Sequence, residues 1–95
     1  QAIDLGYRSI QSLLDRELDA ETREQIKTLA LADSHVKGIH DLRTRQSGKT
    51  IFIQLHLELD GKQPLFDAHR IADATGLRIK NAFEESEVII HQDPV

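Results

Sequence analysis

The chain has 95 residues, enough for one small domain, and a formal net charge of −4. A domain of this size buries only somewhat more than ~60% of the surface of its unfolded chain, so a metal ion or a partner subunit would matter to its stability. The absence of cysteine excludes disulfides and thiolate metal sites. The twelve Lys and Arg residues are scattered except around Arg43 and Arg45, which argues against nucleic acid as the main partner.

No apolar run approaches the ~20 residues that a membrane-spanning helix needs, and no signal peptide is present. We therefore expect a soluble piece. The chain also lacks methionine and begins at Gln1, so we expect a domain excised from a longer protein. We do not expect an enzyme, because the sequence shows no pairing of nucleophile and base, no glycine-rich phosphate loop and no marked substrate pocket.

Two helices are predicted in the first third of the chain. Apolar residues from Ile3 to Leu18 follow helical spacing, and we expect a linker helix over residues 1–18 that docks on, or leads in from, another element. Asp19 begins a second helix, with acidic residues in the first turn where the helix dipole favours them. We assign residues 19–95 to the domain proper.

Two strands follow. Val36–Gln46 is a strand weakened by its charges, and Thr50–Leu59 carries Ile or Leu at every second position, the clearest alternation in the chain. The turn between them decides their register. A three-residue loop would pair His40 with His56, whereas a two-residue Ser-Gly loop would pair His40 with Leu55, on the other face. The sequence leaves both registers open.

A third helix and a final strand complete the domain. Pro64 suits the first position of a helix that runs to about Phe83. The final strand begins at Val88 and ends in His91-Gln92-Asp93, after which Pro94 should stop the pairing. The helix should bury the stripe Leu65, Ala68, Ala72, Thr75, Ile79 and Phe83.

Without the linker helix, the order of elements is αββαβ. We therefore predict an α+β fold, a ferredoxin-like or metallochaperone-like sandwich in which two helices cover one face of a three-stranded sheet. The other face is left uncovered, and a small domain would often hide such a face in a dimer.

His91 and Asp93 are the strongest candidate site. Side chains two positions apart on a strand share a face, so an imidazole nitrogen and a carboxylate oxygen offer half of a site for a divalent metal such as zinc. The alternative is a polar strand end at which Asp93 caps a turn before Pro94. The pair alone does not decide between them.

Three further histidines could complete the site, although each in isolation is more often structural: His40, His56 and His69. Asp41 and Glu58 are carboxylates that could orient the rings of His40 and His56. His69 could be a ligand through its pair with Asp73, four residues later on the helix. His35 sits in a polar connection, and we assign it no role.

The four histidines and the aspartate come from elements that a small sandwich folds together. Zinc needs about four ligands, so this set could supply one site and part of a second. Cadmium, ferrous iron, cobalt and nickel would also be accepted. Because imidazole binds metal in its neutral form, binding should fail in mild acid.

Four blocks of the sequence resemble a known family: Gly38–Gly48, Gln54–Glu58, Ala68–Asp73 and Val88–Pro94. They are similar to the cytoplasmic C-terminal domain of the cation diffusion facilitator family, in particular its bacterial ferrous-iron and zinc efflux transporters. The resemblance covers nearly the whole chain. Leu13–Arg16 looks like the segment where such a transporter leaves the membrane.

The resemblance implies a homodimeric antiporter that exports divalent metal in exchange for protons. This chain would be its metallochaperone-like tail on the cytoplasmic side of the bacterial inner membrane, joined to a transmembrane domain that holds the transport site. The family's binuclear zinc site corresponds here to His40, His56, His91 and Asp93, with a contribution from His69. Zinc bound there would hold the two protomers together and bias the transporter toward export.

Two other roles stay open. In one, the metal is permanently bound and only holds a small dimer together, without responding to the metal concentration. In the other, the chain is a free-standing metal chaperone, which an accessible mononuclear site and a natural start codon near Gln1 would indicate. The lack of methionine speaks against the chaperone.

Overall fold

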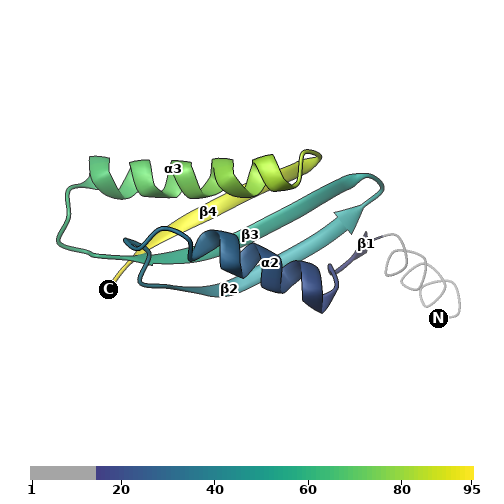
Figure 1. Cartoon of the computed structure of the whole chain (residues 1–95), viewed down its shortest axis with the longest axis horizontal. Coiled ribbons are helices and arrows are strands. Elements are labelled where there is room, and N and C mark those ends of the chain that lie inside the picture. The colour runs from purple at the N-terminus through teal and green to yellow at the C-terminus, as the bar shows by residue number, and fades with distance from the viewer. Residues whose placement is uncertain (1–14) are drawn as a thin grey trace, which may run out of the picture.

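The predicted order of helix, strand, strand, helix and strand is present in the computed structural model, which describes residues 15–95 (Figure 1). The elements are α2 (Ala20–Ala30), β2 (Gly38–Ser47), β3 (Thr50–Leu59), α3 (Leu65–Ala82) and β4 (Ser86–Pro94). The predicted α+β fold is therefore confirmed.

A short strand, β1 (Asp15–Arg16), precedes these elements and adds a fourth strand to the sheet. Most of the linker helix predicted over residues 1–18 lies outside the described residues. Its last part is wrong, because Asp15 and Arg16 pair with Ser47 and Gln46 of β2 as an extended segment. The edge strand of the hairpin offers unpaired backbone N–H and C=O groups. Pairing with these groups outweighs the helical spacing of the apolar residues at these positions.

Helix α2 begins where the sequence predicts it. Asp19 is the N-cap, and one of its carboxylate oxygens accepts a hydrogen bond of 2.8 Å from the backbone N–H of Thr22. This bond satisfies one of the amide groups that the first helical turn leaves unpaired. Ile26 and Ala30 of this helix are fully buried against the sheet and α3.

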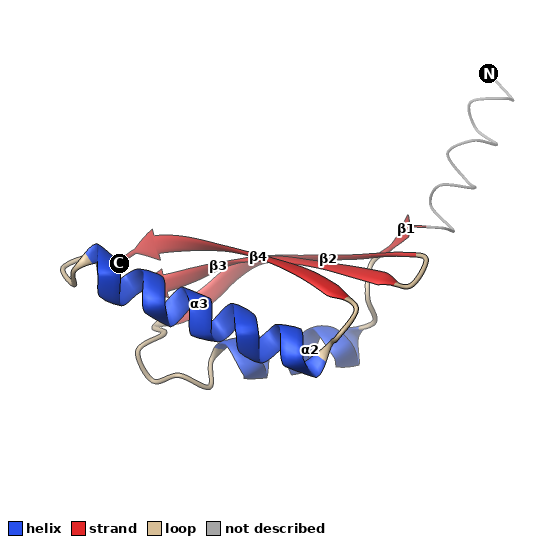
Figure 2. Ribbon diagram, turned by 90° about the horizontal axis from the view of Figure 1, so that it is seen from above, coloured by secondary structure: helices blue, strands red, loops and turns tan. Residues whose placement is uncertain are grey.

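The sheet has the strand order β1-β2-β3-β4. Neighbouring strands are antiparallel up to β3, and β4 then runs parallel to β3. A parallel connection requires a crossover, which α3 provides. Both helices lie on the same side of the sheet, and Figure 2 shows no helix of the described residues on the other side.

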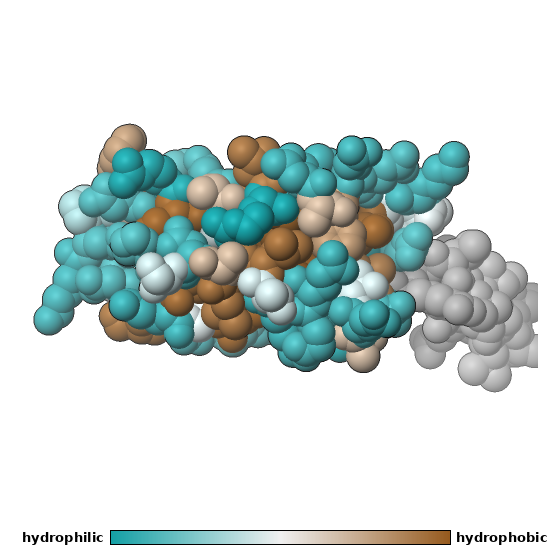
Figure 3. All heavy atoms as spheres, in the orientation of Figure 1, coloured by the Kyte–Doolittle hydropathy of each residue, from teal (hydrophilic) through white to brown (hydrophobic). Residues whose placement is uncertain are grey.

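The core lies between the sheet and the helices. The alternating row of β3 is buried as predicted, and the buried apolar set comprises Ile26, Ala30, Val36, Ile53, Leu55, Leu57, Leu59, Ile71, Ala72 and Ile79. Figure 3 shows the helix-bearing side, where hydrophobic side chains gather along the middle and hydrophilic ones surround them. Among the described residues, no helix is long and apolar enough to cross a membrane.

The buried stripe of α3 differs from the prediction at its first turn. Leu65 is 80% exposed, whereas Ile71, absent from the predicted stripe, is 9% exposed. Pro64 occupies the N-cap position rather than the first helical one. In the first turn, Leu65 and Phe66 are largely exposed, whereas Ala68 packs against the core.

The hairpin register matches neither loop alternative, although the pairing of His40 with His56 is correct. Ser47 pairs with Thr50, so the loop consists of Gly48 and Lys49 alone. Continued without interruption, that register would place His40 opposite Leu57 on the core side. A β-bulge between His40 and Arg43 shifts the register by one residue.

The extra residue of the bulge is accommodated at Asp41, which has a φ of 54°. Aspartate is one of the few residues other than glycine that tolerate this left-handed conformation. The bulge puts Leu42 on the core side and His40 on the open side. The bulge therefore determines that the His40 side chain points to the open side of the sheet, where the other site residues lie.

The end of β4 also differs from the prediction. The strand includes Asp93, as predicted, but Pro94 does not stop the pairing and is itself the register partner of Leu59. Proline can occupy this position because β4 is an edge strand, and the missing N–H would point away from the sheet.

The burial pattern of α3 predicts unequal effects of two substitutions. Ile79→Ala should lower the free energy of unfolding by about 2–5 kcal/mol, because it leaves a cavity in the core. Leu65→Ala should change it by less than about 0.5 kcal/mol. Urea denaturation of metal-free protein measures both, and a large loss from Leu65→Ala would contradict the exposed position of Leu65.

The N-cap of α2 predicts a pH dependence. The hydrogen bonds from Thr22 hold the pKa of Asp19 below its ordinary value. A carboxylate whose pKa is lowered in the folded state stabilises the fold above its unfolded pKa of about 3.9, and this stabilisation is lost as the pH falls through the folded pKa.

Asp19→Asn keeps a neutral capping oxygen at every pH. The stability advantage of the wild type over this variant should therefore be largest above about pH 5 and shrink in stronger acid. Denaturation curves of both proteins across this range measure the difference, and a difference independent of pH would contradict the role of the charged cap.

Candidate metal centre

Three imidazole rings form a row across the open face of the sheet. His40 and His56 are cross-strand partners in β2 and β3, and His56 and His91 are partners in β3 and β4. The ring centroids are 4.9 Å apart in the first pair and 4.5 Å apart in the second, and both pairs are stacked. Because neighbouring strands lie about 4.8 Å apart, direct pairing is sufficient to stack the rings.

Asp93 closes one side of this row. Its Oδ2 atom lies 3.0 Å from Nε2 of His40 and 3.1 Å from Nδ1 of His56. His40, His56 and Asp93 each offer one ligand atom, and these three atoms all lie within 4.8 Å of one another. The structure thus brings together three of the five residues predicted from the sequence.

The donor set suits a borderline divalent cation. Zinc binds imidazole nitrogen and carboxylate oxygen at about 2.0–2.2 Å in a tetrahedral arrangement, which places neighbouring ligand atoms about 3.3 Å apart. The two distances to Asp93 are close to this value. The side chains are 24% exposed for His56, 33% for Asp93 and 46% for His40, so an ion can reach the cluster from solvent.

Carboxylates also approach the outer nitrogens of these two rings. Oε2 of Glu58 lies 2.9 Å from Nδ1 of His40, and Oδ2 of Asp41 lies 3.7 Å from Nε2 of His56. The sequence suggested the opposite assignment, in which each carboxylate orients the histidine nearest to it in the chain. Side chains on adjacent strands meet across the sheet, and sequence neighbours on one strand do not.

Asp41 is held by its own neighbour. Nε of Arg43 donates a hydrogen bond of 3.1 Å to Oδ1 of Asp41. This bond, aided by the positive charge of Arg43 and by the nearby histidines His56 and His40, holds the pKa of Asp41 below its ordinary value. A charged carboxylate therefore stands at the bulge and favours cations on this face.

His91 lies at the outer end of the row. Its predicted place on the same face as Asp93 agrees with the strand alternation, in which both residues face away from the helices. Its Nε2 atom is 3.2 Å from Nε2 of Gln54. Gln54 was not a candidate from the sequence, although its place in the alternation of β3 puts it on the face of His56.

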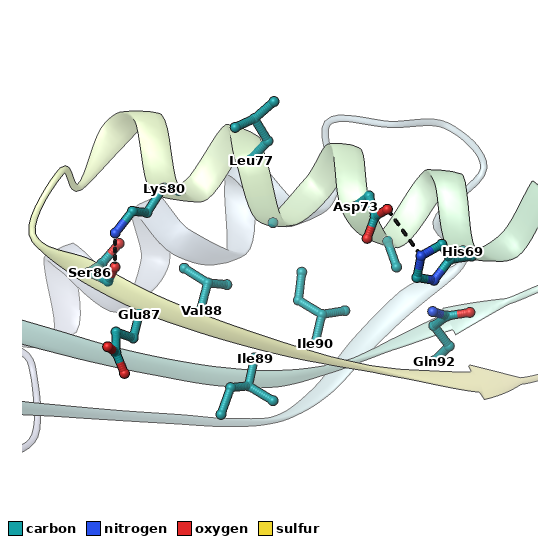
Figure 4. A pocket seen from close by; sticks show the side chains of 12 residues that line it. His69, Asp73, Leu77, Lys80, Ser86, Glu87, Val88, Ile89, Ile90 and Gln92 are labelled. Atoms are coloured by element: carbon teal, nitrogen blue, oxygen red, sulfur yellow. Dashed lines mark hydrogen bonds and ion pairs between the residues drawn. The ribbon is translucent and has the colours of Figure 1, made fainter.

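His69 is not brought to the cluster within the described chain. Its Nε2 atom lies 3.2 Å from Oδ2 of Asp73, one turn further along α3. Figure 4 shows both residues on the helix above β4, with Gln92 below His69. They border an open cavity of about 800 Å³ on the helix side of the sheet, whereas His40, His56 and Asp93 face the open side.

Comparison with known proteins identifies relatives of this chain. Residues 18–95 match the family described as the cytoplasmic domain of cation efflux proteins. The chain is 70% identical over 95 residues to a cation-efflux pump FieF of Shewanella oneidensis, covering all of this chain and 32% of the relative. It is 53% identical over 93 residues to a pump of the same name from Klebsiella pneumoniae, covering 98% of this chain and 31% of the relative. The chain thus spans about a third of these relatives.

Solved structures share the fold. A structure of CzrB, described as a candidate zinc transporter, superposes with a TM-score of 0.77 at 30% identity, covering 82% of this chain and 98% of CzrB. A nickel form of a MamM C-terminal domain superposes with a TM-score of 0.74 at 19% identity, covering 81% of this chain and 99% of the other. The latter supports the fold alone. The resemblance noted in the sequence is confirmed, and the chain belongs to the family of cytoplasmic domains of cation efflux proteins.

Proposed function

We propose that this chain is the cytoplasmic regulatory domain of a divalent-metal efflux transporter in the bacterial inner membrane, and that it binds zinc at a binuclear site that stabilises a homodimer. One observation carries the proposal. Three ligand atoms from three neighbouring strands converge on the open face of the sheet, within 4.8 Å of one another. The role is binding rather than catalysis.

The first ion would be held by Nε2 of His40, Nδ1 of His56 and Asp93. The two nitrogens face the same carboxylate oxygen at 3.0 and 3.1 Å, so they need little rearrangement to share a cation. Three protein ligands leave one tetrahedral position, which water or a further side chain can fill. The bound ion would add positive charge that offsets the clustered carboxylates.

A second ion would use His91, the other oxygen of Asp93 and His69 of a second copy of the chain. His69 lies on the helix side of its own sheet, paired with Asp73. We assign His69 to the metal of the partner protomer, because within its own chain it lies on the other side of the sheet from His40, His56 and Asp93. A ligand set divided in this way makes the second ion a bridge between two copies.

Dimer formation would also cover the helix-free side of the sheet. An ion that binds only the dimer stabilises it by about 2.7 kcal/mol when its free concentration is 100 times its dissociation constant. Rising cytosolic zinc would thereby shift the cytoplasmic domains toward the dimer and favour metal export.

The remaining two thirds of the transporter would supply the export step. The chain covers 31–32% of the FieF pumps it matches, and its partners would be a second copy and the transmembrane domain of the same protein. Proton-coupled exchange would take place in that membrane domain. Nitrogen and oxygen ligands suit zinc, and would accept cadmium, ferrous iron, cobalt or nickel as well.

Zinc titration calorimetry at neutral pH tests the site. The wild-type chain should bind about two ions per protomer. The double variant His91→Ala with Asp93→Ala should lose both, because Asp93 serves both ions. His35→Ala is the matched control, since His35 is an exposed histidine whose ring pairs with Asp33, away from the cluster. Binding that survives unchanged in the double variant would refute the assignment.

His69→Ala tests the bridge between protomers. Zinc binding should fall to about one ion per chain, and the dimer fraction measured by sedimentation should no longer rise with zinc. In the wild type, a chelator should return the dimer fraction to its metal-free value. A zinc-dependent dimer in the variant equal to that of the wild type would contradict the bridge. If the dimer fraction of the wild type is already maximal far below cytosolic zinc levels, the ion has a structural role and does not act as a sensor.

A further inference from the structure

Glu58 contacts the metal-site histidine of the neighbouring strand, not the histidine nearest to it in the sequence. It projects from β3 on the open face, two residues after His56. Oε2 of Glu58 and Nδ1 of His40 are 2.9 Å apart, the separation of a full hydrogen bond. The Glu58 side chain is 32% exposed, so the contact is partly shielded from water.

The two nitrogens of the His40 ring have different partners. Nδ1 faces Glu58, while Nε2 lies 3.0 Å from Asp93 in the metal cluster. A neutral imidazole carries one proton and one free lone pair, and an ionised carboxylate only accepts hydrogen bonds. When Nε2 gives its lone pair to a cation, Nδ1 keeps the ring proton and donates a hydrogen bond to Glu58.

The backbone leaves room for this contact at Gly38, the cross-strand partner of Glu58. A Cβ atom at Gly38 would lie 2.8 Å from Oε1 and 3.4 Å from Cδ of Glu58. The carboxylate therefore occupies the space that a side chain at position 38 would fill. The backbone N–H of Lys37 also donates a hydrogen bond of 2.8 Å to the carbonyl of Glu58, which fixes the two strands at this pair.

We propose that Glu58 is a positioning residue for the metal site, and that Gly38 provides the space it needs. Glu58 would fix the tautomer and the orientation of His40, so that Nε2 is presented to the ion. This inference rests on the proposed metal site and adds to it a residue that does not touch the ion. Outer-shell partners of this kind typically change metal affinity 10–100-fold when they are removed.

The corresponding contact at His56 is weaker. Asp41 is 3.7 Å from Nε2 of His56, too far for a hydrogen bond, and its carboxylate is engaged by Arg43. The structure therefore assigns the positioning role to Glu58, with His40 as the ring that depends on it.

Zinc affinity of the 95-residue chain tests the proposal. Glu58→Ala should raise the dissociation constant about 10–100-fold. Glu58→Gln should have a smaller effect, because an amide oxygen still accepts a hydrogen bond from Nδ1. Gly38→Ala should also weaken binding, because the added methyl group displaces the carboxylate. Glu87→Ala is the matched control: Glu87 is an exposed glutamate on the same face of β4, and its removal should leave affinity unchanged.

Nitrogen-15 NMR of the histidine rings gives a readout that a general loss of stability would not produce. In the zinc-loaded wild type, His40 should coordinate through Nε2 and keep its proton on Nδ1. In Glu58→Ala, that proton should lose its hydrogen-bonded shift, and in Glu58→Gln it should keep it. Circular dichroism establishes that each variant is folded.

The outcomes separate the two proposals. A wild-type chain that binds no zinc would overturn the metal site and this inference with it. Wild-type binding together with equal affinity in Glu58→Ala would overturn the inference alone. Coordination of zinc through Nδ1 of His40 would also overturn it, since that nitrogen would then have no proton to donate to Glu58.

Discussion

The parallel pairing of β4 with β3 is the constraint on which the rest of this structure depends. It sets His91 beside His56 and Asp93 beside Glu58, and so delivers the carboxylate to histidines that lie more than 30 residues earlier in the chain. The same parallel connection requires a crossover helix. Because α3 and α2 share one side of the sheet, a single topological choice both buries the core and leaves the ligand-bearing face open.

The bulge in β2 completes this arrangement. A regular strand that keeps Thr44 on the core side would also turn His40 toward the core, where it would displace apolar contacts. One additional residue, Asp41, shifts the alternation so that His40 points to the open face, and it brings a further charged group to that face. Natural sheets use bulges in this way to re-aim side chains near functional sites. The strained φ at Asp41 is thus associated with a specific gain in geometry.

Much of this structure could be predicted from the sequence where a strong local pattern exists. The alternation of Thr50–Leu59 placed His56 correctly, and two-residue spacing placed His91 and Asp93 on one face. The bulge was missed, although Ile39 and Leu42, both on the core side, are three positions apart, a spacing that a regular strand does not produce. The separation of His69 from the cluster was missed, although the predicted sandwich already puts this helix on the Ile/Leu face of β3, opposite His56.

Strand β2 connects two distant parts of the molecule. Its first half carries His40, and its last residues pair with β1, beside the hairpin tip in Figure 1. About seven residues of extended chain separate these points, roughly 20 Å along the strand. The bulge between His40 and Arg43 lies within this span, so the strand bends between the metal cluster and the segment that pairs with β1. One strand therefore joins the ligand-bearing part of the sheet to the edge at which Asp15 and Arg16 enter it.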